Sequence, residues 1–271
     1  MNEQLNLFNS EVEKVQPPLR YPGSKFRASK HIMPYIKEVN HTEYREPFFG
    51  GGAIFFVKNK ADINWINDID SQLITTYQVI SDINKCEELL NRLEDIKIDK
   101  ESFNQLRDWE PKSEIDIAFK YFVINRTSYS GIMNKPNFGF HPTKSVQPHK
   151  WPERIKKASE KLRNTQITNL HFRDIITEPS NNEVLLFLDP PYYKADQKRA
   201  YRHSFLEKDH QELLELLKCT NFKFCLTYDD CPEIRELYSW ANINQKEWMY
   251  HTANSNNTTR KKGSELIITN Y

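Results

Sequence analysis

Several features that would assign this chain to a common class of protein are scarce or missing. The sequence has only four cysteines, and none of them forms a CxxC pair: Cys86, Cys219, Cys225 and Cys231. The eight histidines do not cluster at metal-ligand spacing. We therefore expect neither a structural zinc site nor a disulfide framework, and we expect no bound metal. Reduced cysteines of this kind are typical of a cytoplasmic protein.

The chain also lacks a strong net charge and a long hydrophobic run. Its 38 Lys and Arg against 37 Asp and Glu leave a formal charge of +1. A near-neutral sum neither indicates nor excludes a polyanionic partner, because local patches matter more than the sum. Apolar runs such as residues 184–188 are far too short to span a bilayer, and the amino terminus is polar and acidic. We therefore expect no membrane span and no signal peptide.

What is present is an alternation of strand-like and helix-like segments. The 271 residues are enough for one large domain or two unequal ones. After a polar tail at residues 1–16, the alternation occupies residues 17–80 and returns in residues 166–271. Residues 81–165 favour helices, with a Gly/Pro/Asn-rich loop or hairpin at 131–149. Because buried apolar runs alternate with helices, we predict an α/β domain in two pieces with a mainly parallel sheet and a helical insertion.

The hydrophobic spacing also predicts the individual elements. The expected strands are residues 43–48, 63–66, 167–172, 184–188, 222–227 and 265–269. The expected helices are residues 53–59, 71–81, 85–96, 114–125, 151–162, 207–218 and 232–240.

The strongest chemical signal is the tetrapeptide Asp189-Pro190-Pro191-Tyr192, which directly follows the apolar strand. Ligands bind at the carboxyl ends of central parallel strands, so Asp189 falls where chemistry is expected. An aromatic amine such as adenine N6 is a poor nucleophile, and hydrogen bonds to the Asp189 carboxylate and the Pro190 carbonyl favour the tetrahedral nitrogen that can attack. The prolines restrict the backbone, and Tyr192 offers a flat face for a flipped base. The alternative is an ordinary Asp-Pro turn.

Two further motifs follow the first two expected strands. Residues 46–53 (Glu-Pro-Phe-Phe-Gly-Gly-Gly-Ala) gather three of the seven glycines, which let backbone N–H groups approach a ligand closely. The pattern is not GxGxxG, because its last position would be Phe55, so a dinucleotide site is not indicated. The second motif places Asp68 where it can accept hydrogen bonds from ribose hydroxyls. We expect Asp70 or Ser71 to cap the helix that follows.

Two basic segments complete the pattern. Residues 20–25 (Arg-Tyr-Pro-Gly-Ser-Lys) end in a lysine that can pair with a ligand carboxylate, although such a loop is more often simply solvated. Residues 260–262 (Arg-Lys-Lys) follow a polar stretch and suit contact with nucleic-acid phosphates, with a solvated turn as the alternative.

Together with residues 125–131 (Asn-Arg-Thr-Ser-Tyr-Ser-Gly) and 259–266 (Thr-Arg-Lys-Lys-Gly-Ser-Glu-Leu), these motifs resemble those of the DNA adenine-N6 methyltransferases. The similarity is to the DNA adenine methylase branch of the alpha group, which carries the Asp-Pro-Pro-Tyr type of tetrapeptide. The order of the motifs is also the family's, and the resemblance covers residues 17–271.

The resemblance implies S-adenosylmethionine as methyl donor, no metal, and a Rossmann-like sheet with a reversed last hairpin. The strands near 246–250 and 265–269 are then expected to be antiparallel. The implied cofactor-binding residues are Tyr21 and Lys25 at the methionine end, the backbone around Phe48, Gly50 and Gly52, Asp68 at the ribose, Asp174 at the adenine, and Asp189. The implied catalytic residues are Asp189, Pro190, Pro191 and Tyr192.

The resemblance further implies that the insertion reads DNA. Tyr129, Ser130, Ile132 and Asn134 fall where the branch has base-contacting residues, and Arg260, Lys261 and Lys262 would contact phosphates. That branch carries Asn and Arg where this chain has Ser130 and Asn134. An Arg makes a bidentate contact to guanine that Asn does not reproduce, so the chain departs from the branch's GATC recognition.

The expected function is site-specific methylation of adenine N6 in double-stranded DNA by a monomer, with a separate restriction endonuclease as a candidate partner. Two alternatives stay open. One is amine methylation of RNA adenine or cytosine N4, because the tetrapeptide is shared across amine methylation. The other is a catalytically silent, sequence-specific DNA-binding protein.

Overall fold

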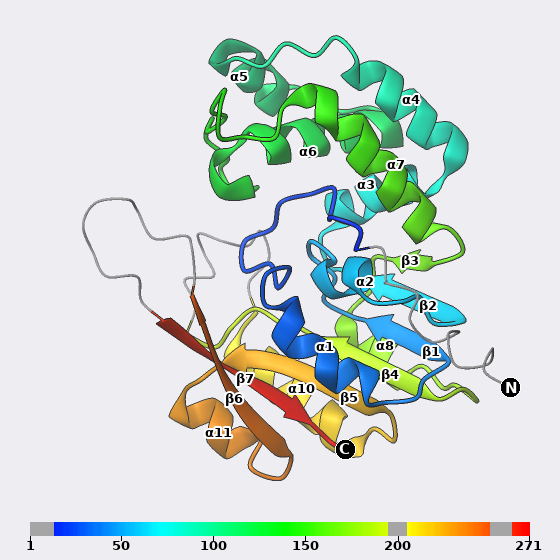
Figure 1. Ribbon diagram of the computed structural model, residues 1–271, viewed down its shortest axis with the longest axis vertical. Coiled ribbons are helices and arrows are strands. Elements are labelled where there is room, and N and C mark those ends of the chain that lie inside the picture. The colour runs from blue at the N-terminus through cyan, green and yellow to red at the C-terminus, as the bar shows by residue number, and fades with distance from the viewer. Residues whose placement is uncertain (1–13, 195–204, 250–261) are drawn as a thin grey trace, which may run out of the picture.

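A computed structural model describes residues 14–194, 205–249 and 262–271 of the chain (Figure 1). The strands in these residues form one mixed sheet in the order β3-β2-β1-β4-β5-β7-β6. Their bounds are β1 (Glu43–Glu46), β2 (Ile63–Asn67), β3 (Gln166–Thr168), β4 (Val184–Leu188), β5 (Lys223–Asp229), β6 (Asn242–Met249) and β7 (Lys262–Thr269). Strands β1 to β5 pair in parallel, whereas β7 is antiparallel to both β5 and β6. The expected Rossmann-like α/β sheet with a reversed last hairpin is therefore confirmed.

Helices cover both faces of this sheet, and the residues of β4 show why. Leu185 and Phe187 join one hydrophobic cluster, whereas Leu186 and Leu188 point to the other face and join a second cluster. The first face is covered by α1 (Ser29–Lys37), α2 (Ala53–Val57) and α3 (Ser71–Ser81). The second face is covered by α8 (Phe172–Thr177), α10 (Glu207–Cys219) and α11 (Pro232–Leu237). A strand buried on both faces explains the continuous apolar run.

The segment 81–165 forms a helical lobe at one end of the molecule (Figure 1). Its helices are α4 (Ile83–Leu93), α5 (Lys100–Asp108), α6 (Glu114–Thr127) and α7 (Trp151–Leu162), and α3 packs against α6 and α7. Between α6 and α7 the chain makes two short 3-10 turns, Tyr129–Gly131 and Pro148–Lys150. A single bridge between Ser128 and Phe138 replaces the paired strands of a hairpin within 131–149. The prolines of this stretch cannot donate to a strand ladder, which fits the irregular path.

The expected strand at 167–172 is wrong at its carboxyl end. Strand β3 stops at Thr168, and Phe172 begins α8 instead. Phe172 and Ile176 lie at helical spacing and bury against the second face of the sheet. The His171 side chain accepts the N–H of Arg173 and so caps the helix. Helix α5 was not expected, because only its Asp99 cap marks it clearly in the sequence.

Within the parts of the chain that the structure describes, no helix is both long and apolar enough to cross a membrane.

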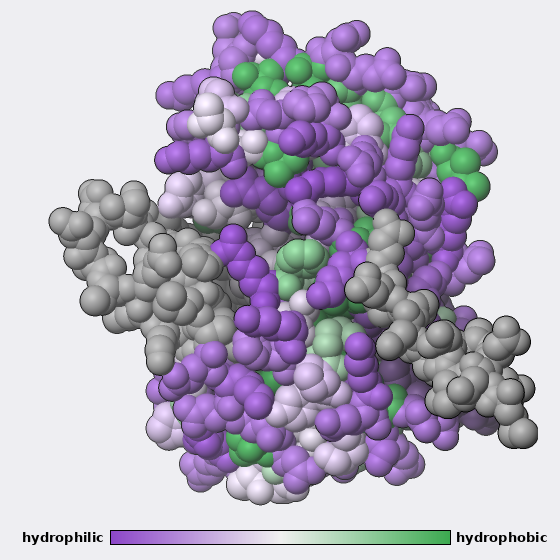
Figure 2. All heavy atoms as spheres, in the orientation of Figure 1, coloured by the Kyte–Doolittle hydropathy of each residue, from purple (hydrophilic) through white to green (hydrophobic). Residues whose placement is uncertain are grey.

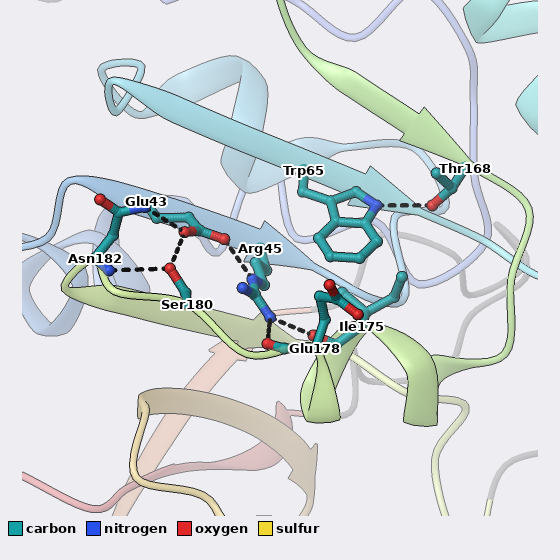
Figure 3. A network of polar contacts seen from close by, with 8 residues as sticks. All are labelled: Glu43, Arg45, Trp65, Thr168, Ile175, Glu178, Ser180 and Asn182. Atoms are coloured by element: carbon teal, nitrogen blue, oxygen red, sulfur yellow. Dashed lines mark hydrogen bonds and ion pairs between the residues drawn. The ribbon is translucent and has the colours of Figure 1, made fainter.

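A buried polar network ties β1 to α8 (Figure 3). Arg45 is fully buried, and its Nε donates to Glu43 Oε1 at 2.6 Å. Its Nη1 donates to the carbonyls of Ile175 and Glu178, at the carboxyl end of α8. The guanidinium also stacks 5.2 Å from the Trp65 ring centroid. Arg45 therefore holds α8 against the sheet, because it donates hydrogen bonds to carbonyls that have no partner within the helix.

We predict that Arg45→Met lowers the free energy of unfolding by about 3–5 kcal/mol, because the Glu43 charge stays buried without its partner. Urea unfolding followed by circular dichroism measures this loss. The double variant Glu43→Gln, Arg45→Met is expected to lose less than Arg45→Met alone, since it leaves no unpaired charge. Arg107→Met is the control, because Arg107 pairs with Asp108 at the surface, where water screens the ion pair and its loss has little effect. Equal losses for Arg45→Met and the control would contradict the argument.

Candidate active site

A cavity of about 320 Å³ lies at the carboxyl ends of β1, β2 and β4. The sheet grows from β1 toward β2 on one side and from β4 toward β5 on the other. Such a switch point is where open α/β sheets bind their ligands. Seven of the residues predicted to bind a cofactor line the cavity: Tyr21, Lys25, Phe48, Gly50, Gly52, Asp68 and Asp189. Asp174 lies in α8 and does not line it, whereas His171 and Phe172 do.

The glycine turn after β1 is shaped by close packing. Gly50 and Gly52 have φ of +49° and +64°, in the left-handed region that favours glycine. A Cβ on Gly50 would lie 2.8 Å from Tyr21 Cε1, and one on Gly52 would lie 2.3 Å from Phe49 Cζ. The backbone of the turn therefore lines the cavity, and the Tyr21 ring packs directly against this backbone.

Asp68 follows β2 and holds the same glycine turn through hydrogen bonds. Its carboxylate accepts the N–H of Gly50 at 2.8 Å and the N–H of Asp70 at 3.0 Å. Burial raises the pKa of Asp68 to about 6. Asp70 accepts the N–H groups of Gln72 and Leu73, so the expected helix cap is confirmed. The two aspartates thus have separate tasks, and only Asp68 has its carboxylate on the glycine turn.

Asp189 follows β4 and is held from two sides. Lys25 Nζ lies 2.9 Å from Oδ1 and 3.0 Å from Oδ2 of Asp189. Thr227, which is buried in β5, donates its hydroxyl to Oδ1 at 2.7 Å. Lys25 also donates to the carbonyl of Gly23 at 2.9 Å, which keeps the loop before α1 tight. The carboxylate is therefore fixed at the strand end, with its charge balanced by one buried lysine.

The rest of the tetrapeptide is held by the antiparallel end of the sheet. The Tyr192 hydroxyl donates to Glu265 Oε2, on β7, at 2.5 Å. Asp229, at the end of β5, accepts the N–H of Tyr193 at 3.0 Å and that of Lys194 at 3.1 Å. Sequence reasoning quoted Glu265 only as part of the motif at residues 259–266 and did not single out Asp229, because no local pattern links either residue to the tetrapeptide.

The cavity has more acidic than basic groups. Glu46, Asp68 and Asp189 line it. Among the described residues, Lys25 is the only Lys or Arg in the cavity wall. Burial raises the pKa of Glu46 to about 8, and the Tyr44 hydroxyl donates to its Oε2 at 2.7 Å. Such a wall suits a ligand that carries positive charge.

Aromatic rings also line the cavity. Phe48, Phe172 and Phe205 all line it. The Phe48 ring centroid lies 5.2 Å from that of Phe172 and 5.6 Å from that of Phe205. Sequence reasoning missed Phe172 and Phe205, which lie far apart in the chain and belong to no motif. The cavity therefore fits a molecule that carries both a flat ring and a cationic group.

The four residues predicted to contact bases lie between α6 and α7. Tyr129 is 49% exposed, and Ser130, Ile132 and Asn134 are half-buried. Ser130 has φ of +55°, which the surrounding turn imposes on a non-glycine residue. Of the three basic residues predicted to contact phosphates, Arg260 and Lys261 lie outside the described residues. Lys262 begins β7.

This segment is hydrogen-bonded to the loop that carries Tyr21. The Asn125 side chain accepts the N–H of Arg20 at 2.8 Å and donates to the carbonyl of Arg20 at 2.7 Å. Arg20 Nη1 donates to the carbonyl of Ser128 at 3.1 Å. A Cβ on Gly131 would lie 2.6 Å from Arg20 Cβ, so only glycine permits this approach.

Among the described residues, no group of three or more His, Cys, Asp and Glu side chains is placed to hold a metal ion. All four cysteines are free thiols.

The buried carboxyl of Glu46 predicts an unusual dependence of stability on pH. The folded chain keeps this proton to about pH 8, whereas the unfolded chain loses it near pH 4.5. Folding therefore takes up a proton in this window, and its contribution to the free energy of unfolding falls as pH rises from about 5 to 8. We expect Glu46→Gln, which keeps the Tyr44 hydrogen bond, to flatten that decline in urea unfolding measured from pH 5 to 8.5. Glu215→Gln, at an exposed carboxyl on α10, is the control, and an unchanged slope in Glu46→Gln would contradict the assignment.

Comparison with known proteins agrees with this geometry. Residues 21–252 match the family of D12 class N6 adenine-specific DNA methyltransferases. The type II methyltransferase M.CviBI of Paramecium bursaria Chlorella virus NC1A is 26% identical over 268 residues, covering 95% of this chain and 100% of that protein. M1.LlaDCHI of Lactococcus lactis subsp. cremoris is 28% identical, covering 98% and 99%, and M.MjaIII of Methanocaldococcus jannaschii is 27% identical, covering 95% and 100%. Both are also type II methyltransferases. Because the match extends over most of its length, the chain belongs to the D12 class of N6 adenine-specific DNA methyltransferases.

Proposed function

We propose that this chain transfers a methyl group from S-adenosylmethionine to N6 of an adenine that is flipped out of double-stranded DNA. The observation that carries the proposal is the position of Asp189. Its carboxylate stands at the carboxyl end of β4, is fixed by Thr227 and Lys25, and opens on the same cavity as the glycine turn. An acceptor for the amine and a cradle for the donor thus share one space.

The residues present fit S-adenosylmethionine. The left-handed turn at Gly50 and Gly52 leaves no room for side chains, so its backbone is free to approach a ligand. Tyr21 and this turn would hold the methionine part, and Asp68 would accept the ribose hydroxyls. For the adenine we now favour the rings of Phe48 and Phe172, because Asp174 does not line the cavity.

The charges fit as well. When bound, the donor supplies a methyl group on a cationic sulfur. Asp68 and Asp189 place negative charge around the cavity, and buried charges act strongly because water screens them little. Burial keeps Glu46 protonated to about pH 8, and a bound cation would favour its ionised form. Lys25 was expected at the methionine end of the cofactor, but its ammonium pairs with Asp189 in this structure. We assign it first to holding Asp189.

At the amine, the chain's task is to prepare a poor nucleophile. The Asp189 carboxylate and the Pro190 carbonyl accept hydrogen bonds from the two N6–H groups, which turns the nitrogen lone pair out of the ring plane toward the methyl carbon. The bond from nitrogen to methyl forms as the bond from sulfur to methyl breaks, and the electron pair stays on sulfur. Tyr192 stacks on the flipped base. We place loss of the N6 proton after the transfer.

The helical lobe is the proposed DNA reader. Asn125 bonds the loop of Tyr21 to the turn that carries the residues proposed to contact bases, which are Tyr129, Ser130, Ile132 and Asn134. The residues proposed to contact phosphates are Arg260, Lys261 and Lys262. Figure 2 shows a largely hydrophilic face on which hydrophobic residues form small separate groups. Such a face suits a polar partner such as DNA better than an apolar one. We further propose a monomer that works beside a separate restriction endonuclease.

We predict that Asp189→Asn lowers the rate of methyl transfer by about 100- to 1,000-fold, the usual effect of removing one preorganised group from a reacting centre. The assay measures transfer of tritiated methyl groups from S-adenosylmethionine to genomic DNA that lacks adenine methylation. Digestion to nucleosides then identifies N6-methyladenine or N4-methylcytosine. Asp189→Ala should also fold and lose activity.

The control for this prediction is Asp108→Asn, at an exposed carboxylate of α5. Circular dichroism and calorimetric titration with S-adenosylmethionine check that each variant folds and binds the donor. Methylation of ribosomal RNA in place of DNA, or an active Asp189→Ala variant, would overturn the proposal. A wild-type chain that binds no S-adenosylmethionine would point to the silent DNA-binding protein.

A further inference from the structure

Glu265 is a buried acidic residue that does not line the cavity, and the motif at residues 259–266 in which it stands assigned it no role. It lies on β7, directly opposite Asp229 of β5, and only 1% of it is exposed. Its Oε2 accepts the Tyr192 hydroxyl at 2.5 Å, whereas its Oε1 is buried and has no hydrogen-bond partner. The next residues of the strand, Leu266 and Ile267, are fully buried and apolar.

A carboxyl group in this position is costly for the fold. Burying it removes its hydration, and an unpartnered buried oxygen adds a further penalty. An apolar side chain like those that follow it would pack there at lower cost. Buried polar groups of this kind are found where function requires them. The cost is therefore best explained by what Glu265 touches, which is the aromatic residue of the catalytic tetrapeptide.

The groups around the tetrapeptide hold different parts of it. Thr227 bonds the Asp189 side chain, and Asp229 bonds the main chain beyond Tyr192. Lys25 Nζ lies 4.6 Å from the centre of the Tyr192 ring, so it acts on the ring face and not on the hydroxyl. The bond to Glu265, across 73 positions of sequence, holds the hydroxyl end of the ring from β7, and the Thr227 side chain also hydrogen-bonds Tyr192.

We propose that Glu265 is a positioning residue for methyl transfer, which sets the plane of the Tyr192 ring and thereby the place of the target base beside Asp189. The inference rests on the proposed function. The reversed hairpin of β6 and β7 then has a task beyond completing the sheet, because it brings the acceptor for this bond to the end of β4.

Charged groups surround Glu265 on each side. Burial raises the pKa of its carboxyl to about 7, Lys25 opposes that rise, and Asp189 and Asp229 add to it. Lys246 lies opposite on β6, with its ammonium over the Tyr35 ring of α1. The ionised carboxylate makes the stronger, charge-assisted bond to a hydroxyl. Methyl transfer by the wild-type chain is therefore expected to slow as pH falls through about 7.

A double-mutant cycle tests the inference. The four proteins are the wild type, Glu265→Gln, Tyr192→Phe and the double variant. Single-turnover methyl transfer is measured with tritiated S-adenosylmethionine and genomic DNA that lacks adenine methylation, and calorimetry measures binding of S-adenosylmethionine. We expect each single change to slow transfer about ten- to a hundredfold, with donor affinity within about twofold of wild type. Because Glu265 acts through Tyr192, the double variant should be no slower than the slower single variant.

The pH profile gives a second readout that a purely structural role would not move. Both single variants should lose the decline in rate below pH 7. If Glu265→Gln does not fold, Tyr192→Phe alone tests the same limb, because it removes the bond without changing the carboxyl. Asp230→Asn is the matched control, since Asp230 directly follows β5 and its carboxylate pairs with Ser264 and Arg235 and does not line the cavity.

A Glu265→Gln variant as fast as wild type, or losses that simply add in the double variant, would overturn the inference while leaving the proposed function intact. A loss in Asp230→Asn as large as that in Glu265→Gln would also overturn it. A wild-type chain that transfers no methyl group to DNA would instead reject the proposed function itself.

Discussion

The ion pair between Lys25 and Asp189 is the contact on which the arrangement of the cavity depends. It joins the loop before α1 to the carboxyl end of β4, two parts of the chain that are 164 positions apart. Lys25 is only 5% exposed, so its charge needs a partner, and both oxygens of Asp189 lie within 3.0 Å of it. The loop therefore cannot move away from the strand without leaving a buried charge. Because Tyr21 belongs to that loop, the packing of its ring on the glycine turn follows from the same constraint.

The charge that remains after this pairing is negative, so the cavity favours a cationic ligand. Burial raises the pKa of Glu46 to about 8 and that of Asp68 to about 6, so the fold holds these carboxyls closer to their neutral forms than water would. A bound cation reverses that tendency, because each ionised carboxylate then has a partner. In the proposed reaction the sulfur of the donor is cationic before transfer and neutral afterwards. The same field therefore favours the donor over the spent product, which helps the product to leave.

The features that sequence reasoning found are those set by local rules. The apolar run of β4 followed by Asp189, the glycine turn after β1, and the Asp70 cap after β2 each depend on neighbours in the chain. What it missed depends on contacts between distant segments. Phe172 ends the segment Ile-Thr-Asn-Leu-His-Phe, which was expected to be a strand, but it starts α8. The strand has a partner for only three residues, and the helix buries its apolar residues against the second face of the sheet. Glu265 reads as one more polar residue in a basic, polar region, and only the antiparallel pairing of β7 with β5 brings it to Tyr192.

The Asn125 side chain extends this argument from the cavity to the helical lobe. An amide that both accepts from and donates to the main chain of Arg20 acts like one rung of a strand ladder, so it fixes position and direction together. The bond from Arg20 to the Ser128 carbonyl and the close approach of Gly131 leave the turn at Tyr129 little freedom relative to Tyr21. The residues proposed to read DNA and those proposed to hold the methyl donor are thus parts of one hydrogen-bonded unit. A displacement of the turn at Tyr129 must therefore move the loop of Tyr21, and the reverse, because neither segment can shift without breaking hydrogen bonds that are partly shielded from water.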